Sequence, residues 1–136
     1  MKVLGISFYK IDLERKEDSF KNIKISTKLN ILGIQKSSST LLTDSESPIK
    51  IKFEYELNYE QDIALLKFSG YLLVSLSHSE SDEILNKWEE KKIPEKFKEI
   101  IFNSIFRKCN LKALQFEEEL NLPPHLPLPS FKIKGK

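Results

Sequence analysis

Carboxylates are plentiful among the side chains of this 136-residue chain that could do chemistry, with 20 Asp and Glu in all. Glu54 and Glu56 lie two residues apart in an alternating segment, which puts both on one face of a strand about 7 Å apart. Carboxylates at such a separation can do acid–base work. The interleaved Lys50 and Lys52 favour a plainer interpretation, a solvated and charge-balanced strand face. No nucleophile, base and orienting group can be assembled around the pair, so we expect no catalytic residues and no enzyme activity.

The histidines and the cysteine give no stronger signal. His78 lies in a polar segment, His125 lies among prolines, and neither takes part in an HxxxH, HExxH or CxxC spacing. The four glycines are scattered, which argues against a phosphate-binding loop. We therefore expect no metal and no cofactor. Cys109 is predicted to be a buried apolar residue, and a Cys–His pair activated by Arg107 and Lys108 is the open alternative.

Composition and charge indicate one globular domain. The chain is 40% hydrophobic and 31% charged, and its net charge of +2 is too small to indicate nucleic-acid binding. Four tyrosines could stack on bases, but such sites need a basic groove, and here lysines alternate with glutamates. No segment approaches the length of a membrane span and no signal peptide fits the start. We expect a cytoplasmic protein without membrane insertion.

Alternation of apolar and polar residues predicts four strands, at about residues 3–14, 23–35, 49–59 and 63–76. The third is the clearest, since every odd residue from Ile49 to Tyr59 is apolar. A tight turn at 60–62 makes the third and fourth strands a hairpin. The pattern changes face at Phe8–Tyr9, which predicts a bulge or a strand with both faces partly covered. Residues 36–47 are predicted to form an exposed loop that ends at Pro48.

Two helices follow. A short one at 82–91 is predicted to be capped by Ser79 or Ser81, and a long one at 95–120 to have Pro94 in its first turn. Four strands followed by two helices predict an α+β fold with a four-stranded antiparallel sheet. The apolar face of the long helix is wide enough to contact both this sheet and a second helix or subunit.

The last segment is rich in proline. Residues 122–131 favour polyproline II, and their leucines and phenylalanine suggest an arm docked on a surface. We therefore divide the chain into one domain at 1–122 and a C-terminal arm at 123–136.

Two motifs add to this order of elements. Ile-Ile-Phe-Asn-Ser-Ile-Phe-Arg-Lys-Cys at 100–109 and Leu-Asn-Leu-Pro-Pro at 120–124 are similar to the long helix and the following Leu-Asn-Leu-x-Pro element of the SecB export chaperones. The chain ending also resembles the L-x-L-P-P-x-x-P-L-P ending of a group of small archaeal proteins, some described as SecB-like. SecB proteins are acidic and have a helix after the proline element, whereas this chain is slightly basic and has a short basic tail. A contact with the export motor is therefore not implied.

The resemblance implies a SecB-like ATP-independent holdase that binds unfolded or partly folded polypeptides in apolar grooves. It also implies a homodimer or homotetramer with helices at the interface, for which the candidates are Phe102, Ile105, Phe106 and Cys109. The candidate polypeptide-binding residues are Tyr9, Ile11, Leu13, Tyr71 and Leu73, with Leu126, Leu128 and Phe131 covering or lining the groove. Any one of these residues could instead close the oligomer.

A second hypothesis uses the same oligomeric fold differently. The chain would be an adaptor that binds one folded partner in a large assembly such as the ribosome, or in a toxin–antitoxin system. The basic tail formed by Lys132, Lys134 and Lys136 is the sequence feature that supports it, and it leaves nucleic-acid or ribosome contact open.

Overall fold

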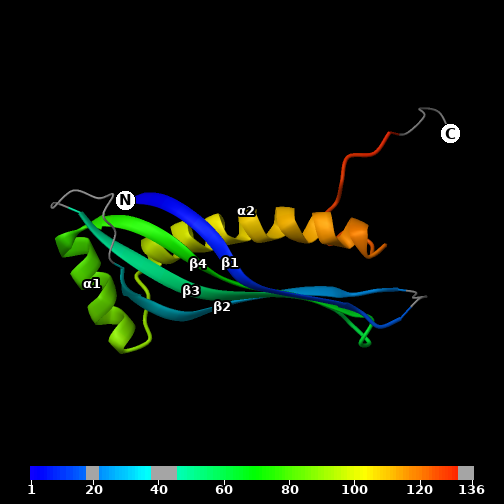
Figure 1. Cartoon of the computed structure of the whole chain (residues 1–136), viewed down its shortest axis with the longest axis horizontal. Coiled ribbons are helices and arrows are strands. Elements are labelled where there is room, and N and C mark those ends of the chain that lie inside the picture. Colours follow the sequence, from blue (N-terminus) through cyan, green and yellow to red (C-terminus); the bar gives the residue numbers. More distant parts are fainter. Residues whose placement is uncertain (18–21, 38–45, 132–136) are drawn as a thin grey trace.

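The computed structural model describes residues 1–17, 22–37 and 46–131. Its elements follow one another as β1 (Lys2–Arg15), β2 (Ile25–Lys36), β3 (Glu46–Tyr59), β4 (Ala64–Ser77), α1 (His78–Glu89) and α2 (Glu95–Glu119). α1 lies at one end of the sheet, and α2 runs lengthwise beside it (Figure 1). The predicted α+β fold, a four-stranded antiparallel sheet followed by a short and a long helix, is confirmed.

The four strands form one antiparallel sheet in the order β1-β4-β3-β2, so β4 and β3 are central and β1 and β2 are the edges. The register of β1 on β4 shifts between Phe8 and Lys10, which confirms the predicted bulge at Phe8–Tyr9. Further shifts lie between Val3 and Gly5 on β1 and between Ile31 and Gly33 on β2. Such bulges increase the local twist of both edge strands.

One face of the sheet carries the core. The odd residues of β3 are fully buried, as the alternation predicted: Ile49, Ile51, Phe53, Tyr55, Leu57 and Tyr59. Phe68 of β4 pairs with Tyr55, and their rings stack 5.5 Å apart. α2 covers this face, because Phe106 and Phe116 place their rings 6.3 and 5.9 Å from those of Tyr55 and Phe68. We call it the helix face and the opposite one the open face.

α2 turns a regular stripe toward the sheet. Its buried residues recur at every fourth position: Phe97, Ile101, Ile105, Cys109, Ala113 and Glu117. This spacing keeps side chains on one face of a helix. The prediction placed Pro94 in the first turn of the helix, whereas the structure places it immediately before that turn, as the N-cap residue. Its carbonyl accepts the first helical hydrogen bond from the Lys98 N–H at 2.8 Å. The helix therefore begins one residue later than a first-turn proline would require.

The end of α2 is a Schellman motif. Asn121 adopts a positive φ of 54°, which asparagine tolerates better than most residues. The Leu122 N–H then donates to the Glu117 carbonyl at 2.8 Å, and the Asn121 N–H donates to the Glu118 carbonyl at 3.2 Å. Arg15 of β1 donates to the carbonyl of Leu120 at 2.8 Å. The chain is thus turned back along the helix where the proline arm begins.

α1 differs from its prediction at both ends. It spans His78–Glu89, and its cap is Ser77, whose hydroxyl accepts from the Glu80 N–H, rather than Ser79 or Ser81. Ser81 is instead buried and bonded to Ser47 at 3.2 Å. The predicted loop is also shorter than expected: its positions 38–45 lie outside the described residues, while 46–48, including Pro48, belong to β3. Pro48 has no N–H to donate, and its carbonyl accepts from the Ser37 N–H at 3.0 Å.

Candidate polypeptide-binding surfaces

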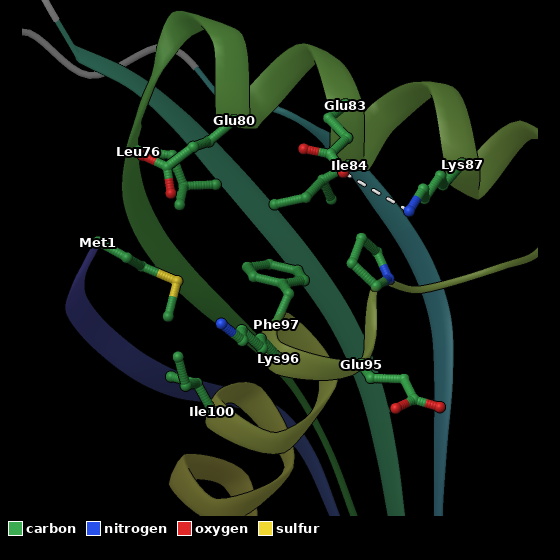
Figure 2. A pocket seen from close by; sticks show the side chains of 11 residues that line it. Met1, Leu76, Glu80, Glu83, Ile84, Lys87, Glu95, Lys96, Phe97 and Ile100 are labelled. Carbon is green, nitrogen blue, oxygen red and sulfur yellow. Dashed lines mark ion pairs between the residues drawn. The ribbon is translucent and has the colours of Figure 1, made fainter.

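A concave surface lies where the two helices meet the end of the sheet. This α1–α2 groove has a volume of about 620 Å³. It is lined by Met1, Leu76, Glu80, Glu83, Ile84, Lys87, Pro94, Glu95, Lys96, Phe97 and Ile100. Figure 2 shows Phe97, Met1 and Ile100 facing the same space from the helix start and from the end of β1.

The turn between the helices creates this groove. The Lys91 N–H donates to the Trp88 carbonyl at 2.8 Å, and Lys91 takes a positive φ of 59°. α1 therefore ends abruptly, and Pro94 starts α2 after only a few extended residues. Because the helices diverge from this connection, their apolar sides do not fill the space between them.

The groove has an apolar floor and a charged rim. Leu76, Ile84 and Phe97 form the buried floor, whereas Ile100 is 42% exposed at the side. On the rim Glu83 and Lys87 form an ion pair at 3.5 Å (Figure 2). Such a surface suits an apolar side chain of an extended polypeptide, whose backbone polar groups would stay near the charged rim.

A second surface lies on the open face of the sheet. Tyr9 and Tyr71 place their rings 5.0 Å apart, with the Lys50 amine 4.1 Å from the Tyr71 ring and the Lys52 amine 5.5 Å from the Tyr9 ring. A depression of about 310 Å³ next to them reaches the half-buried Leu73. The two rings are tilted by 36° to each other, and together with the cation–π contacts they form a partly apolar platform.

The sequence suggested that Lys50 and Lys52 balance Glu54 and Glu56, but these two lysines contact the tyrosine rings. Lys67 of β4 is the cation that pairs with Glu54, at 3.3 Å. Lys50 and Lys52 cover aromatic rings instead.

The predicted groove residues do not form one groove. Tyr9, Tyr71 and Leu73 share the open face. Ile11 and Leu13 pair with Phe68 and Leu66 and therefore point to the helix face. The bulge after Phe8 is the reason, since one extra residue reverses the alternation of all that follows.

Within one chain the arm does not lie on the open face, and a covering or lining role for Leu126, Leu128 and Phe131 stays a prediction. Leu126 and Leu128 are exposed, and the Phe131 side chain is 92% exposed. The arm leaves from the end of α2 far from the N-terminus (Figure 1). Leu128 lines a depression of about 320 Å³ with Leu114, Glu118 and Leu122 of its own chain.

The predicted interface residues divide into two groups. Ile105 and Cys109 have no exposed surface and belong to the chain's own core, so the prediction is wrong for these two. Phe102 and Phe106 are half-buried, with rings in edge contact at 6.2 Å, and their role in an interface stays a prediction. Desolvation by burial raises the pKa of the Cys109 thiol to about 12, which argues against the alternative of an activated Cys–His pair.

The sequence reasoning missed the α1–α2 groove and the environment of Glu117. The groove depends on the angle between two helices, for which the sequence carries no local signal. For Glu117 the sequence did carry a local signal, because Glu117 continues the four-residue stripe after Ala113 and must therefore face the core. Within residues 1–17, 22–37 and 46–131, no three His, Cys, Asp or Glu side chains are grouped as a metal would require. Among the same residues, no helix has the length and apolar character that crossing a membrane requires.

Comparison with known proteins identifies the architecture. No family model matches the chain, and no curated protein matches its sequence. Among solved structures, a similar one is the Mycobacterium tuberculosis SecB-like chaperone Rv1957 in complex with a ChAD peptide from the Rv1956 HigA1 antitoxin. The two share 14% identity and superpose with a TM-score of 0.59, over 97% of this chain and 92% of the other.

The chain has the SecB-like fold. At this identity the similarity concerns the fold, and the resemblance to the archaeal group stays a prediction. The SecB-like architecture places the sheet and the long helix as the element order implied, and the α1–α2 groove and the open face are the surfaces it leaves accessible in this chain.

Proposed function

We propose that this SecB-like chain is an ATP-independent holdase that binds non-native polypeptides in apolar grooves. The observation that carries the proposal is the α1–α2 groove, with its buried apolar floor and charged rim. Unfolded chains present apolar side chains spaced by polar backbone, and this groove matches that alternation. The chaperone of similar fold is bound to a peptide of another protein, which supports an extended partner.

The open face would add a second contact. Tyr9, Tyr71 and Leu73 offer aromatic and aliphatic surface on one side of the edge strand β1. An edge strand also carries unpaired N–H and C=O groups, to which an extended client can add hydrogen bonds. A client segment longer than one groove could use both surfaces.

We further propose a cytoplasmic homodimer or homotetramer without cofactor or enzyme activity. Phe102 and Phe106 are the interface candidates, because they present apolar rings on the side of α2 next to its buried stripe. Exposed apolar surface of this kind normally marks an interface. The domain of residues 1–122 would form the oligomer, with the arm of 123–136 outside it. Light scattering on a Phe102→Ser/Phe106→Ser variant tests this, and an unchanged mass would exclude these two residues.

The holdase proposal is tested by aggregation of a urea-denatured enzyme diluted into buffer without ATP. The wild-type chain should suppress light scattering at a few-fold molar excess. Ile100→Asp puts a charge into the groove and should weaken the suppression several-fold. Leu111→Asp is the matched control, since Leu111 lies on the same helix, is 62% exposed and does not line the groove. The proposal fails if the wild type has no effect, or if the two variants behave alike.

The adaptor hypothesis stays the second candidate. Lys50 and Lys52 flank the open-face tyrosines, so this face could meet one folded, acidic partner. Affinity purification in moderate salt would then return one partner in defined stoichiometry. Recovery of many unrelated unfolded chains favours the holdase instead.

A further inference from the structure

A buried polar cluster joins the proline arm to the body of the protein. Glu117 is 1% exposed and lies at the end of the buried stripe of α2. The side chain of His125, from the arm, is 3% exposed and contacts it. Two buried ionisable groups on neighbouring segments require complete hydrogen bonding, since each unsatisfied group would destabilise the fold.

The cluster meets that requirement. Nδ1 of His125 lies 2.8 Å from Oε1 of Glu117, and the His125 backbone N–H donates to Oε2 of the same carboxylate at 2.8 Å. Nε2 of His125 lies 3.0 Å from Oδ1 of Asn110. One imidazole thus bridges two positions of α2 that are seven residues, or two turns, apart.

Two tyrosines of β3 complete the cluster from the sheet. The Tyr59 hydroxyl donates to Glu117 and lies 2.7 Å from the carbonyl oxygen of Pro123. The Tyr55 hydroxyl donates to Oδ1 of Asn110 at 2.7 Å. Burial, with the nearby Glu117 as a further cause, raises the pKa of both phenols. Both hydroxyls therefore stay protonated and act as donors.

The hydrogen-bond partners determine which nitrogens of the histidine ring carry a proton. Oδ1 of Asn110 already accepts from Tyr55, and the carboxylate of Glu117 already accepts from Tyr59 and from a backbone N–H. Both ring nitrogens of His125 thus face acceptors. An imidazole can donate from both nitrogens only when it is doubly protonated.

We propose that His125 is a proton-dependent latch that holds the arm on the end of α2. When the ring carries both protons, it donates to Glu117 and to Asn110, and the arm is closed. When one proton is lost, a nitrogen lone pair faces an acceptor oxygen, and the buried Glu117 loses the positive charge of its His125 partner. The latch is therefore closed while the ring holds both protons and opens when one of them is lost.

Groups from α2, β3 and β1 surround the cluster. The titratable groups that face the cluster are Glu117 and Cys109 from α2 and Tyr55 and Tyr59 from β3. Arg15 of β1 is bound to the carbonyls of Leu120 and Asn121 at the helix end.

Opening would change the accessible surface. Leu122, directly before the arm, is buried in the core, and Leu128 of the arm lines a depression together with Leu114. Release of His125 would uncover this apolar strip together with Tyr59. If the proposed holdase function holds, the strip is a client surface controlled by pH, but the latch itself does not depend on that function.

The test is NMR of the full-length ¹⁵N-labelled protein between pH 5 and 9, without any client. At low pH the His125 ring should show two protonated nitrogens, and the amides of His125, Leu126 and Leu128 should have order parameters of about 0.85. At high pH the same amides should fall below about 0.6, following the titration of that ring.

Variants separate the latch from general stability. His125→Gln cannot carry the charge and should leave the arm equally mobile at every pH. His78→Gln is the matched control, since it removes the other histidine and should preserve the transition. The proposal is overturned if the ring holds a single proton while the arm is ordered. It is also overturned if arm order does not change with pH, or changes equally in His125→Gln.

Discussion

Replacement of Gly70 by alanine should be among the most destabilising single-methyl additions in this protein. Gly70 lies in β4, the central strand, opposite Phe53 on one side and Phe8 on the other. A Cβ at this position would lie 2.3 Å from the backbone oxygen of Ser7 and 2.9 Å from Cζ of Phe53. Ordinary contacts of this kind are more than 3 Å long. The Phe53 ring could turn, but the oxygen of Ser7 belongs to the backbone of β1.

The magnitude follows from what must move. To accept the methyl group, β1 has to shift by roughly 1 Å at its bulge, away from the strand that holds it in the sheet. Insertion of a methyl group into a close-packed core typically costs about 1–3 kcal/mol, and a backbone obstacle places Gly70→Ala at the upper end. With a urea dependence of about 2 kcal/mol per molar, a loss of about 3 kcal/mol lowers the unfolding midpoint by about 1.5 M.

The chain offers a matched control in the neighbouring strand. A Cβ at Gly33 would meet only Cβ of Lys52, at an ordinary 3.9 Å, and neither glycine needs a positive φ. Gly33→Ala should therefore be neutral, or stabilise by up to about 1 kcal/mol because the unfolded chain loses freedom. Urea unfolding followed by circular dichroism measures both variants. If the urea midpoints of the two variants lie within about 0.3 M of each other, their free energies of unfolding differ by less than about 1 kcal/mol. That result would refute the argument from close approach at Gly70.

Three further predictions concern the interior. Burial raises the pKa of the Cys109 thiol to about 12. The thiol of the folded protein should therefore react with a disulfide reagent at pH 8 at least about a thousandfold more slowly than the thiol of the urea-unfolded protein. Equal rates would mean that the thiol is accessible. Tyr59→Phe removes the hydroxyl that contacts Glu117 and Pro123, and it should lower the free energy of unfolding in urea by about 1–3 kcal/mol. Tyr71→Phe on the open face should lower it by less than about 0.5 kcal/mol. Because the pKa of Tyr55 and Tyr59 is raised, the folded state keeps protons that the unfolded chain releases above about pH 10, so stability should fall as pH rises beyond it. The double variant Tyr55→Phe/Tyr59→Phe should lose less stability over that range, and an identical slope in a series of urea curves would contradict the assignment.

Much of the fold could be predicted because its signals are local. Strand β3 shows strict alternation from Ile49 to Tyr59, and α2 carries apolar residues at every fourth position. These periods follow from the geometry of an extended chain and of a helix, so neighbouring residues alone reveal them. The change of face at Phe8–Tyr9 is equally local, and it marked the bulge correctly.

The candidate sites were less predictable because they depend on long-range pairing. Ile11 and Tyr9 look alike in the sequence, yet the register of β1 on β4 sends them to opposite faces. The α1–α2 groove exists because of the angle at which two helices leave one short connection. No composition or spacing within a single segment records that angle.

By itself, then, the sequence determined the elements, their order and the residues of the core face, since these follow from periodicity and from the residues that end helices. Tertiary structure alone decided which surfaces remain accessible and which polar groups meet. His125 reaches Glu117 because Asn121 reverses the chain, and Tyr59 reaches both because β3 lies under that helix end. Tyr59 and Glu117 are 58 residues apart in the chain. Their contact is specified by strand order, register and helix packing together, and these are properties of the whole fold.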